Sequence, residues 1–269
     1  MDRDFQDYIE ALFNATEFDS AFKAFEDQVH QMGFDGALYT FIPKVLLDFE
    51  FIVEPVYKVS TSFDQGYLAH YAQARFDRHD PLIKAVQDGV PDPIDWWGEL
   101  SESYKMQSPQ SKLVIDEARS YGIQNGLTIP LMSGRQGISG ASIISREGQE
   151  AYERLTTEKL HNLKITTQLF HSLVTSNATY LGKFSRPMLE ELNDKERRYL
   201  AGLAEGKSAS EIADSLCTTN KYLEQLMLKI RRKLSGVGPF DPPTINRNQV
   251  LYYAGLMNIL EYGDSRGKH

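Results

Sequence analysis

The C-terminal third of the chain shows three runs of apolar residues at helical spacing, each preceded by residues that start helices. Ser208 stands three positions before Glu211, which is the spacing of a capping box, so a helix begins there. Thr219 offers an N-cap for the next helix almost at once, and Asn193 with Glu196 starts the helix before. Three closely spaced helices with a very short step between the last two predict a helix-turn-helix, whose last helix docks in the major groove of DNA.

The first 175 residues alternate between helical and strand-like patterns. Apolar residues at helical spacing predict helices over 5–13, 22–32, 63–75, 81–86, 110–121 and about 156–172. Aromatic and β-branched runs predict strands over 36–42, 51–60, 126–132 and 138–145. Strands in hairpin order, with helices before and after, predict an α+β fold: an N-terminal α-β-α sandwich on an antiparallel sheet, followed by a small all-α helix-turn-helix domain.

The length of 269 residues suits two domains. Residues 176–187 are weakly periodic and end in a proline, so we interpret them as a linker. The predicted organisation is a ligand-binding domain over 1–175, a linker over 176–187 and a DNA-binding domain over 188–269.

The formal net charge of −8 is unusual for a DNA-binding protein, but the acidic residues are unevenly placed. From Met188 onward the chain has 12 Lys and Arg against 11 Asp and Glu, which leaves 17 against 26 for the remainder. Six basic residues can form a local face for phosphates, although a solvated helix face would have the same composition. They are Lys207, Lys221, Lys229, Arg231, Arg232 and Lys233.

The chain begins MDRDFQDYIE, without the basic and apolar segments of a secretory signal, and no apolar run is long enough to cross a bilayer. A cytoplasmic protein without membrane association is expected. Cys217 is the only cysteine, so an internal disulfide and a thiolate metal cluster are impossible, and a packed thiol is expected. No histidine spacing suits a metal, so neither a metal nor another cofactor is expected, and His161 and His171 are predicted at the surface or its boundary.

The C-terminal residues resemble the DNA-binding domain of LuxR-type transcription factors. The matching residues are Glu205-Gly206-Lys207-Ser208, Glu211-Ile212-Ala213, Ile230-x-x-Lys233-Leu234 and Asn246-Arg247-x-Gln249-Val250. The resemblance implies that the helix after Thr219 reads DNA and that a helix over 247–260 serves dimerisation. Residues 236–245 form a longer connection to that last helix than the family has, which leaves its placement open.

The resemblance also implies which residues meet DNA. Phosphate contacts are expected from Lys207, Lys229 and Arg232, and base contacts from Asn220, Lys221, Glu224, Gln225 and Leu228. The family usually has a small or hydroxyl residue followed by valine early in this helix, and often a histidine one turn later, whereas this chain has Tyr222, Leu223 and Leu226. Because a glutamate is repelled by phosphates but accepts from a cytosine amino group, two interpretations stay open: recognition of an unusual operator, or weakened or lost DNA binding.

The N-terminal half resembles the autoinducer-binding domain of the same regulators. The matching residues are Tyr67-x-x-x-Tyr71, Asp80-Pro81, Trp96-Trp97 and Ala118-Arg119-Ser120-Tyr121-Gly122-Ile123-x-x-Gly126-Leu127-Thr128-Ile129-Pro130. In that family a tryptophan, a tyrosine, an aspartate and a second tryptophan surround an acyl-homoserine lactone. The resemblance assigns these roles to Tyr71, Asp80 and either Trp96 or Trp97, while Tyr67 stands where the family has its first tryptophan. Phe63 and Ser142 complete the expected ligand contacts.

The chemistry of these residue types fits such a ligand. A buried amide N–H needs an acceptor such as Asp80, Tyr71 can donate to an acyl carbonyl, and a tryptophan face can cover a lactone ring. Tyr67 can donate too, but from a different place, so an amphipathic molecule without a lactone stays an alternative. Without the resemblance, Tyr67 and Tyr71 equally suit a core pair one helical turn apart, and Asp80 suits the N-cap of a helix opened by Pro81.

The sequence therefore predicts a ligand-responsive, DNA-binding transcription regulator of quorum-sensing type. It is not expected to be an enzyme, because no motif places a nucleophile, a base and an orienting acid together. The expected partners are double-stranded DNA, a small-molecule autoinducer and a second copy of the chain. The alternative is a paralogue without DNA binding that sequesters another regulator in mixed dimers.

Overall fold

The computed structural model describes residues 3–48, 54–256 and 258–260. The chain divides into two compact units, one of Met1–Phe41 with Pro55–Tyr180 and the other of Ile42–Glu54 with Leu181–His269. The boundary at Tyr180 falls inside helix α9 (Ala178–Glu190), so most of the predicted linker is helical. The domain limits at 175 and 188 stay a prediction.

A five-stranded sheet forms the centre of the first unit. Its strands are β1 (Gly36–Pro43), β2 (Tyr57–Val59), β3 (Ile94–Asp95), β4 (Asn125–Ser133) and β5 (Gly137–Ser145), and they lie in the order β2-β1-β5-β4-β3. β4 pairs antiparallel with β5, with Asn125 opposite Ser145 and Ser133 opposite Ile138. The pairs β1–β2 and β3–β4 are antiparallel too, so the predicted antiparallel sheet is confirmed.

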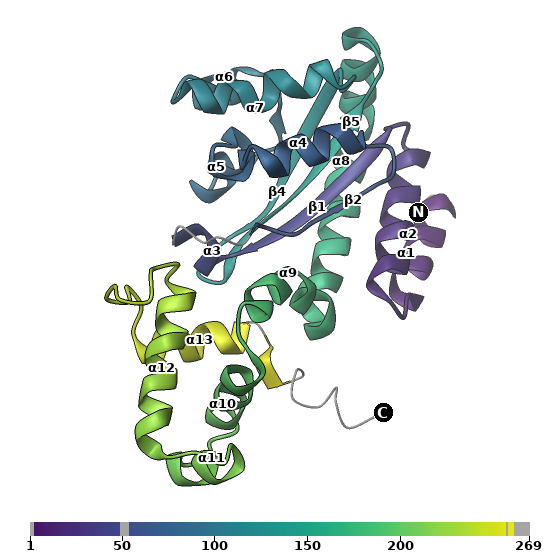
Figure 1. The fold of residues 1–269 in the computed structure, drawn as a ribbon. Coiled ribbons are helices and arrows are strands. Elements are labelled where there is room, and N and C mark those ends of the chain that lie inside the picture. Colours follow the sequence, from purple (N-terminus) through teal and green to yellow (C-terminus); the bar gives the residue numbers. More distant parts are fainter. Residues whose placement is uncertain (1–2, 49–53, 257, 261–269) are drawn as a thin grey trace. The chain divides into compact units, whose positions relative to one another are not determined.

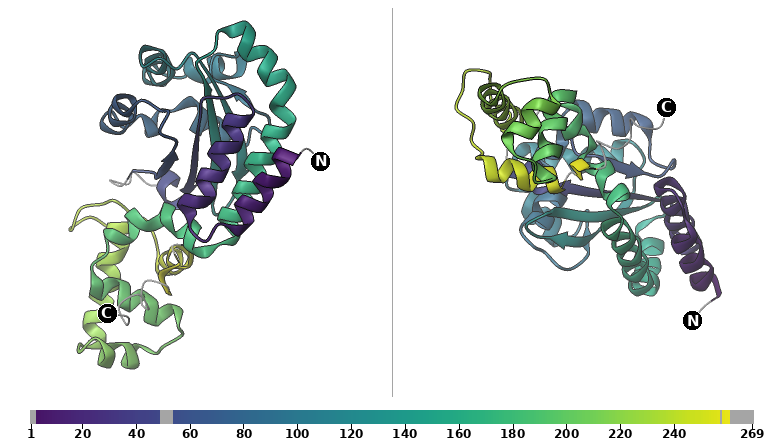
Figure 2. Two further views of the ribbon diagram at one scale, coloured as in Figure 1. Left: turned by 90° about the vertical axis from the view of Figure 1, so that its right-hand side faces the viewer. Right: turned by 90° about the horizontal axis from the view of Figure 1, so that it is seen from below.

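Helices cover both faces of this sheet, as Figure 1 and Figure 2 show. One face carries α4 (Gln65–Gln73), α5 (Pro81–Gln87), α6 (Glu99–Lys105) and α7 (Pro109–Ser120), and the other carries α1 (Arg3–Asn14), α2 (Phe18–Gln31) and α8 (Gln149–Ser176). Between α2, α8 and the sheet, Phe170 stacks on Phe25 at a centroid distance of 4.8 Å and meets the Tyr39 ring edge-on at 5.0 Å. The predicted α-β-α sandwich is confirmed.

Some element boundaries differ from the predicted ones. Helix α8 begins at Gln149 and not near residue 156, and the buried Tyr152 extends its apolar side toward the N-terminus. Of the strand predicted over 51–60, only β2 is present, and residues 51–53 lie outside the described residues. The sequence predicts neither β3 nor α6, because elements of two and seven residues are too short to show a period.

His171 of α8 is buried, so its predicted place at the surface is wrong, whereas His161 on the same helix is exposed. The His171 Nδ1 atom lies 2.9 Å from the Tyr39 hydroxyl oxygen, which gives the buried ring a hydrogen-bond partner. Burial lowers the pKa of His171 to about 4, so the imidazole is neutral at pH 7.

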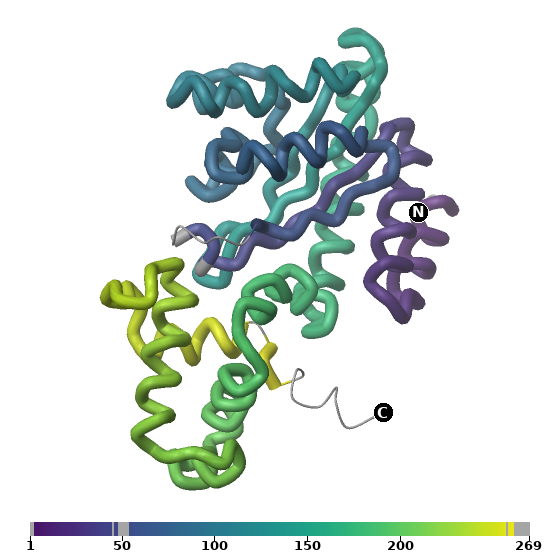
Figure 3. Tube along the Cα trace, viewed as in Figure 1, coloured from purple at the N-terminus to yellow at the C-terminus, as the bar shows by residue number. Residues whose placement is uncertain are grey.

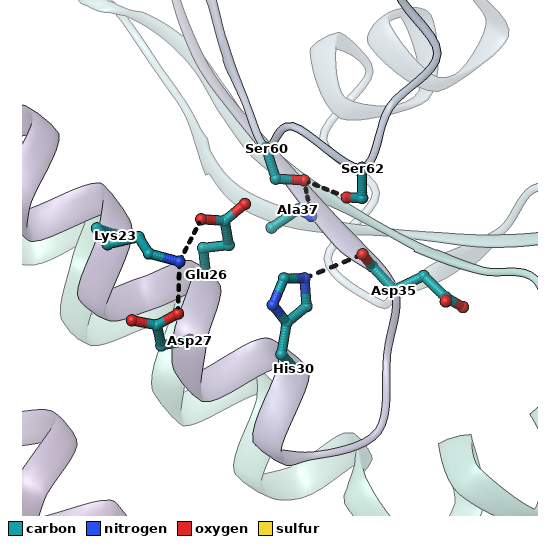
Figure 4. Close-up of polar contacts among 8 residues, drawn as sticks. All are labelled: Lys23, Glu26, Asp27, His30, Asp35, Ala37, Ser60 and Ser62. Carbon is teal, nitrogen blue, oxygen red and sulfur yellow. Dashed lines mark hydrogen bonds and ion pairs between the residues drawn. The ribbon is translucent and has the colours of Figure 1, made fainter.

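Side-chain hydrogen bonds fix the edge of the sheet near the end of α2, as Figure 4 shows. His30 donates from its ring to the Asp35 carbonyl oxygen at 3.0 Å, which ties the end of α2 to the start of β1. The Ser60 Oγ atom accepts from the Ala37 N–H at 3.0 Å and lies 2.7 Å from the Ser62 Oγ atom. These bonds hold β2 and the chain that follows it against β1.

The second unit contains α3 (Lys44–Asp48), α10 (Asp194–Ala204), α11 (Ala209–Ser215), α12 (Asn220–Leu234) and α13 (Arg247–Leu256). Figure 3 follows the chain through the short turn from α11 to α12. Asn193 with Glu196 and Ser208 with Glu211 form reciprocal capping boxes, and Thr219 accepts from the Tyr222 N–H. The predicted helix starts are therefore confirmed.

Cys217 lies in the turn between α11 and α12 with a left-handed backbone, φ 48°. Its side chain is exposed, so the predicted packed thiol is wrong. Leu216 before the turn and Leu223 after it take the buried positions, and the residue that reverses the chain is left in solvent.

The long connection 236–245 is fixed to the end of α12. Arg231 Nε donates to the Ile245 carbonyl oxygen at 2.7 Å, and Arg232 Nε donates to the Asp241 carbonyl oxygen at 2.9 Å. Beyond this connection, α13 begins at the predicted residue 247 and extends to residue 256, and residue 257 lies outside the described residues. Of the helices in the described part of the chain, none combines the length and the apolarity needed to span a membrane.

Candidate functional site

A tyrosine–aspartate pair joins α4 to the start of α5. The Tyr71 hydroxyl donates to Asp80 Oδ2 at 2.7 Å, while Asp80 Oδ1 accepts from the Leu82 N–H at 2.7 Å and the Ile83 N–H at 3.4 Å. Asp80 is thus the N-cap of the helix that Pro81 opens and also the acceptor for Tyr71. The Asp80 carboxylate therefore fits both interpretations: one oxygen caps the helix, and the other accepts the hydrogen bond from Tyr71.

An arginine–aspartate pair holds the loop between these two helices. Arg75 has a left-handed backbone, φ 51°. Its guanidinium donates from Nε to Asp77 Oδ1 at 2.9 Å and from Nη2 to Asp77 Oδ2 at 3.0 Å. Because two parallel bonds fix orientation as well as distance, this pair holds the turn that brings Asp80 back to Tyr71.

Burial dominates the electrostatics of the Tyr71–Asp80 pair. It raises the pKa of Asp80 above its ordinary value, against the Tyr71 hydroxyl and the amides of α5, which favour the carboxylate. Burial also raises the pKa of Tyr71 well above its ordinary value, and the charge of Asp80 adds to that rise. Tyr71 is therefore protonated at neutral pH and acts as the donor of the pair.

Tyr57 of β2 joins this group, although the sequence does not single it out. Its ring lies edge-on to the Tyr71 ring at a centroid distance of 5.7 Å, and the Tyr67 ring approaches Tyr71 at 6.1 Å. Burial and then the charge of Asp80 raise the pKa of Tyr57 well above its ordinary value, and the neighbouring Tyr71 hydroxyl offsets part of that rise. The two hydroxyls therefore interact, although within the described residues the buried Tyr57 oxygen has no hydrogen bond of ordinary length and angle. The sequence signal for Tyr57, an aromatic residue in a predicted strand, is typical of any core.

A second polar group lies just after β3 and on β4 and β5, and α5 packs on β4 and β5. Trp96 Nε1 donates to Thr128 Oγ1 at 2.9 Å, and Ser142 Oγ lies 2.9 Å from the same oxygen. The Trp96 ring packs on Gly126, where a Cβ atom would come within 2.4 Å of it. The structure thus brings Trp96 and Ser142 together through Thr128, a residue the sequence shows only within a family motif.

Trp97 and Phe63 do not belong to the group formed by Trp96, Thr128 and Ser142. Trp97 is only partly buried, its indole N–H makes no hydrogen bond within the described residues, and the Arg119 guanidinium lies 4.4 Å from its ring centroid. Phe63 is buried just after β2, with its N–H donating to the Ser60 carbonyl oxygen at 3.2 Å. Of the two candidate tryptophans, Trp96 is therefore the one buried against the sheet.

The residues expected to contact bases lie on the outward side of α12. Asn220, Lys221, Glu224 and Gln225 are exposed, and Leu228 is partly buried. The opposite side of the helix is buried in the core of the unit through Leu223, Leu226, Met227, Ile230 and Leu234. Because one side of α12 is buried in this core, the outward side is available to a binding partner.

The residues expected to contact phosphates differ in their surroundings. Lys229 is exposed, whereas Lys207 forms an ion pair with Glu205 at 2.5 Å. Arg232 is partly buried and engaged with the connection 236–245. The assignments of ligand and DNA contacts stay predictions.

Comparisons with known proteins agree with this architecture. Residues 17–174 match the family model described as autoinducer binding domain. The chain is 23% identical over 232 residues to the transcriptional activator protein AnoR of Acinetobacter nosocomialis, a match that covers 86% of this chain and 91% of AnoR. It is 24% identical over 246 residues to the HTH-type quorum-sensing regulator RhlR of Pseudomonas aeruginosa, and this match covers 89% of each chain.

A solved structure shares the fold. The crystal structure of Escherichia coli SdiA matches with a TM-score of 0.50 at 16% identity, over 95% of this chain and 97% of SdiA. At that identity the likeness concerns the fold alone.

Proposed function

The chain belongs to the family of LuxR-type regulators with an autoinducer-binding domain, and from that membership we propose that it is a DNA-binding transcription regulator that senses an acyl-homoserine lactone or a related amphipathic molecule. The observation that carries the proposal is the hydrogen bond between Tyr71 and Asp80, within the matched residues and beside the rings of Tyr57 and Tyr67. A carboxylate suits an amide N–H, and aromatic rings suit the apolar part of such a ligand.

The second half of the proposal concerns DNA. We propose that α12 lies in the major groove and that two copies of the chain present two such helices to two half-sites. The exposed row of Asn220, Lys221, Glu224 and Gln225 and the short turn from α11 support this assignment. We place the protein in the cytoplasm, where DNA is accessible.

Ligand and DNA are proposed to be coupled by linkage. A ligand that binds only the folded, dimer-competent chain stabilises it by mass action, by about 2.7 kcal/mol at a hundredfold excess over Kd. The relatives compared above are named as an activator and a regulator, and nothing in them favours a protein that sequesters another regulator.

The test begins with protein purified from a host that makes no homoserine lactones. Unfolding temperatures are measured with butanoyl-, octanoyl- and dodecanoyl-homoserine lactone, with their ring-opened forms and with acyl amides that lack the ring. We expect at least one of these compounds to raise the unfolding temperature in a concentration-dependent way. If none does, the sensor assignment is wrong; binding that vanishes on opening the ring would identify the ligand as a lactone.

The DNA half is tested separately by selection from a random duplex pool with ligand-saturated protein at moderate salt. Enrichment of a two-fold symmetric site is expected. Failure to enrich any sequence would overturn the DNA assignment and leave the sensor assignment standing.

A further inference from the structure

We propose that Phe240 enters the minor groove of DNA beside each half-site and wedges between two base pairs. The inference rests on the proposed function, namely that α12 lies in the major groove. The contact comes from the connection 236–245, outside the residues that are expected to meet DNA.

Phe240 stands at the tip of a tight turn in this connection, and its side chain is 94% exposed. Two hydrogen bonds close the turn. The Asp241 N–H donates to the Gly238 carbonyl oxygen at 3.2 Å, and the Gly238 N–H donates to Asp241 Oδ2 at 3.1 Å. A side chain at position 238 would disturb this arrangement, since a Cβ atom there would come within 2.7 Å of Asp241 Oδ2. The phenyl ring is therefore held in solvent by a bonded turn.

The base of the connection is bonded to the end of α12. Arg232 Nε donates to the Asp241 carbonyl oxygen at 2.9 Å, and Ser235 Oγ donates to the Arg231 carbonyl oxygen at 2.7 Å while accepting from the Thr244 N–H at 3.1 Å. The three prolines of the connection restrict its backbone further, because each fixes its own φ. An aromatic side chain on such a preorganised support loses little entropy on binding, and aromatic anchors dominate many binding interfaces.

The charge around the turn indicates an anionic partner. From Lys229 to Phe240 the chain has four basic residues and no acidic one. Asp241 follows directly, but one of its carboxylate oxygens already accepts from the Gly238 N–H. Lys229 is exposed and lies one turn before this end of α12. DNA is the polyanion to which the proposed function brings α12, so we assign the partner of Phe240 as DNA.

The length of α12 places the turn at the neighbouring minor groove. Its 15 residues span about 22 Å at 1.5 Å per residue. Residues 220–228, which contain the expected base contacts, take about 13 Å of this, close to the major-groove width of about 12 Å. In a helix that crosses the groove, the last six residues then extend over the phosphates of the groove wall. Figure 3 shows the connection at this end of α12, away from the turn that follows α11.

A phenylalanine at this place has a known chemical use. Apolar side chains that enter the minor groove insert between base pairs, unstack them partly and bend the duplex. Unstacking costs least at a pyrimidine–purine step such as TA and more in a stiff A-tract. The inference therefore includes a sequence preference for a flexible step beside each half-site, at a position that α12 does not contact.

The experiment uses a duplex with the site enriched from a random pool, in which 2-aminopurine replaces one flanking adenine at a time. This base fluoresces more strongly when it is unstacked. The proteins are the parent, Phe240→Ala, Phe240→Leu and the control Phe13→Ala, which removes a phenylalanine that is 56% exposed on α1 of the other unit. Because Phe240 is nearly fully exposed, its two variants should keep the unfolding temperature of the parent.

The parent should raise the fluorescence several-fold at one flanking position of each half-site. Phe240→Leu should keep most of this rise, since leucine is also an apolar wedge, and Phe240→Ala should abolish it. The Kd for the duplex should rise about five- to thirtyfold in Phe240→Ala and stay at the parent value in Phe13→Ala. With a stiff A-tract in place of the flexible step, the parent and Phe240→Ala should differ less.

Two results would overturn the inference and leave the proposed function standing: the same fluorescence rise in the parent and Phe240→Ala, or the same Kd for the duplex. Sedimentation of the free proteins tests a second copy of the chain as the partner. If Phe240→Ala weakens self-association without DNA, the side chain contacts that copy and the DNA assignment is wrong. If the parent enriches no site from the pool, the proposed DNA function and the inference fall together.

Discussion

Acidification should destabilise the N-terminal unit through His171. The imidazole is buried between α8 and β1, and burial lowers its pKa from 6.5 to about 4. Between these two values the unfolded chain binds a proton that the folded chain does not. The stability that comes from keeping this histidine neutral is therefore fully present above pH 6.5 and is lost as the pH falls toward 4.

The size of this effect follows from the shift in pKa. One unit corresponds to about 1.4 kcal/mol, so the whole shift amounts to roughly 3 kcal/mol. Between pH 7.5 and pH 5 the loss should be roughly 2 kcal/mol, because the folded protein has hardly begun to bind the proton at pH 5.

Tryptophan fluorescence can follow this unfolding selectively, because Trp96 and Trp97 are the only tryptophans of the chain and both belong to the N-terminal unit. Urea unfolding is compared at pH 7.5 and pH 5 for the parent, His171→Asn and His161→Asn. The asparagine at 171 does not titrate, and His161 is an exposed histidine of the same helix. The parent and His161→Asn should each lose roughly 2 kcal/mol more than His171→Asn on acidification. The same pH dependence in all three proteins would refute the argument.

Three further substitutions test other parts of the structure. Asp80→Asn removes the charged acceptor of Tyr71, and because bonds to charged groups contribute about 1.5–3 kcal/mol, the rise in unfolding temperature with octanoyl-homoserine lactone should shrink. If the titrations of the variant and the parent superimpose, Asp80 acts only as a helix cap and has no role in ligand binding. Ser208→Ala removes the cap of α11 and should cost about 1 kcal/mol in melts followed by circular dichroism, whereas the exposed Ser210→Ala should change stability by less than about 0.5 kcal/mol; equal effects would contradict the capping argument. Glu224→Ala should change the preference at one base pair by about 1–3 kcal/mol in selection experiments, with binding to unrelated DNA level or tighter. A uniform loss on every sequence would remove Glu224 from base recognition.

The helix starts of the C-terminal unit can be predicted from the sequence because their causes are local. Ser208 bonds the amide of Glu211 three residues on, and Thr219 bonds the amide of Tyr222 at the same spacing. Such bonds depend on nearest neighbours and not on the rest of the fold. The pairing of Tyr71 with Asp80 is less local, and it is expected only because a family pattern connects the two residues.

The features that the sequence does not show depend on distant partners. His171 is buried because Tyr39, 132 residues away, supplies its hydrogen bond. Tyr57 belongs to the site because β2 brings it beside Tyr71, and its type alone does not distinguish it from an ordinary core aromatic. Whether a polar ring or a hydroxyl is buried depends on the residues that pack around it, and the order of residues along the chain does not show which ones these are.

The helix starts of the C-terminal region and the strand pairings of the sheet differ in how far apart their bonded residues lie, and this has a consequence for how the chain folds. Helices α10, α11 and α13 begin with bonds between residues three positions apart, the last between Asn246 and Gln249. In the sheet, by contrast, β1 lies beside β5, and Ser139 of β5 bonds the Thr40 carbonyl oxygen across 99 positions. Local contacts form quickly, whereas distant strand pairings form slowly. Because synthesis runs from the N-terminus, β1 leaves the ribosome long before its neighbour β5. Until β5 is made, β1 has an unpaired edge, and during that interval the chain is most prone to aggregation.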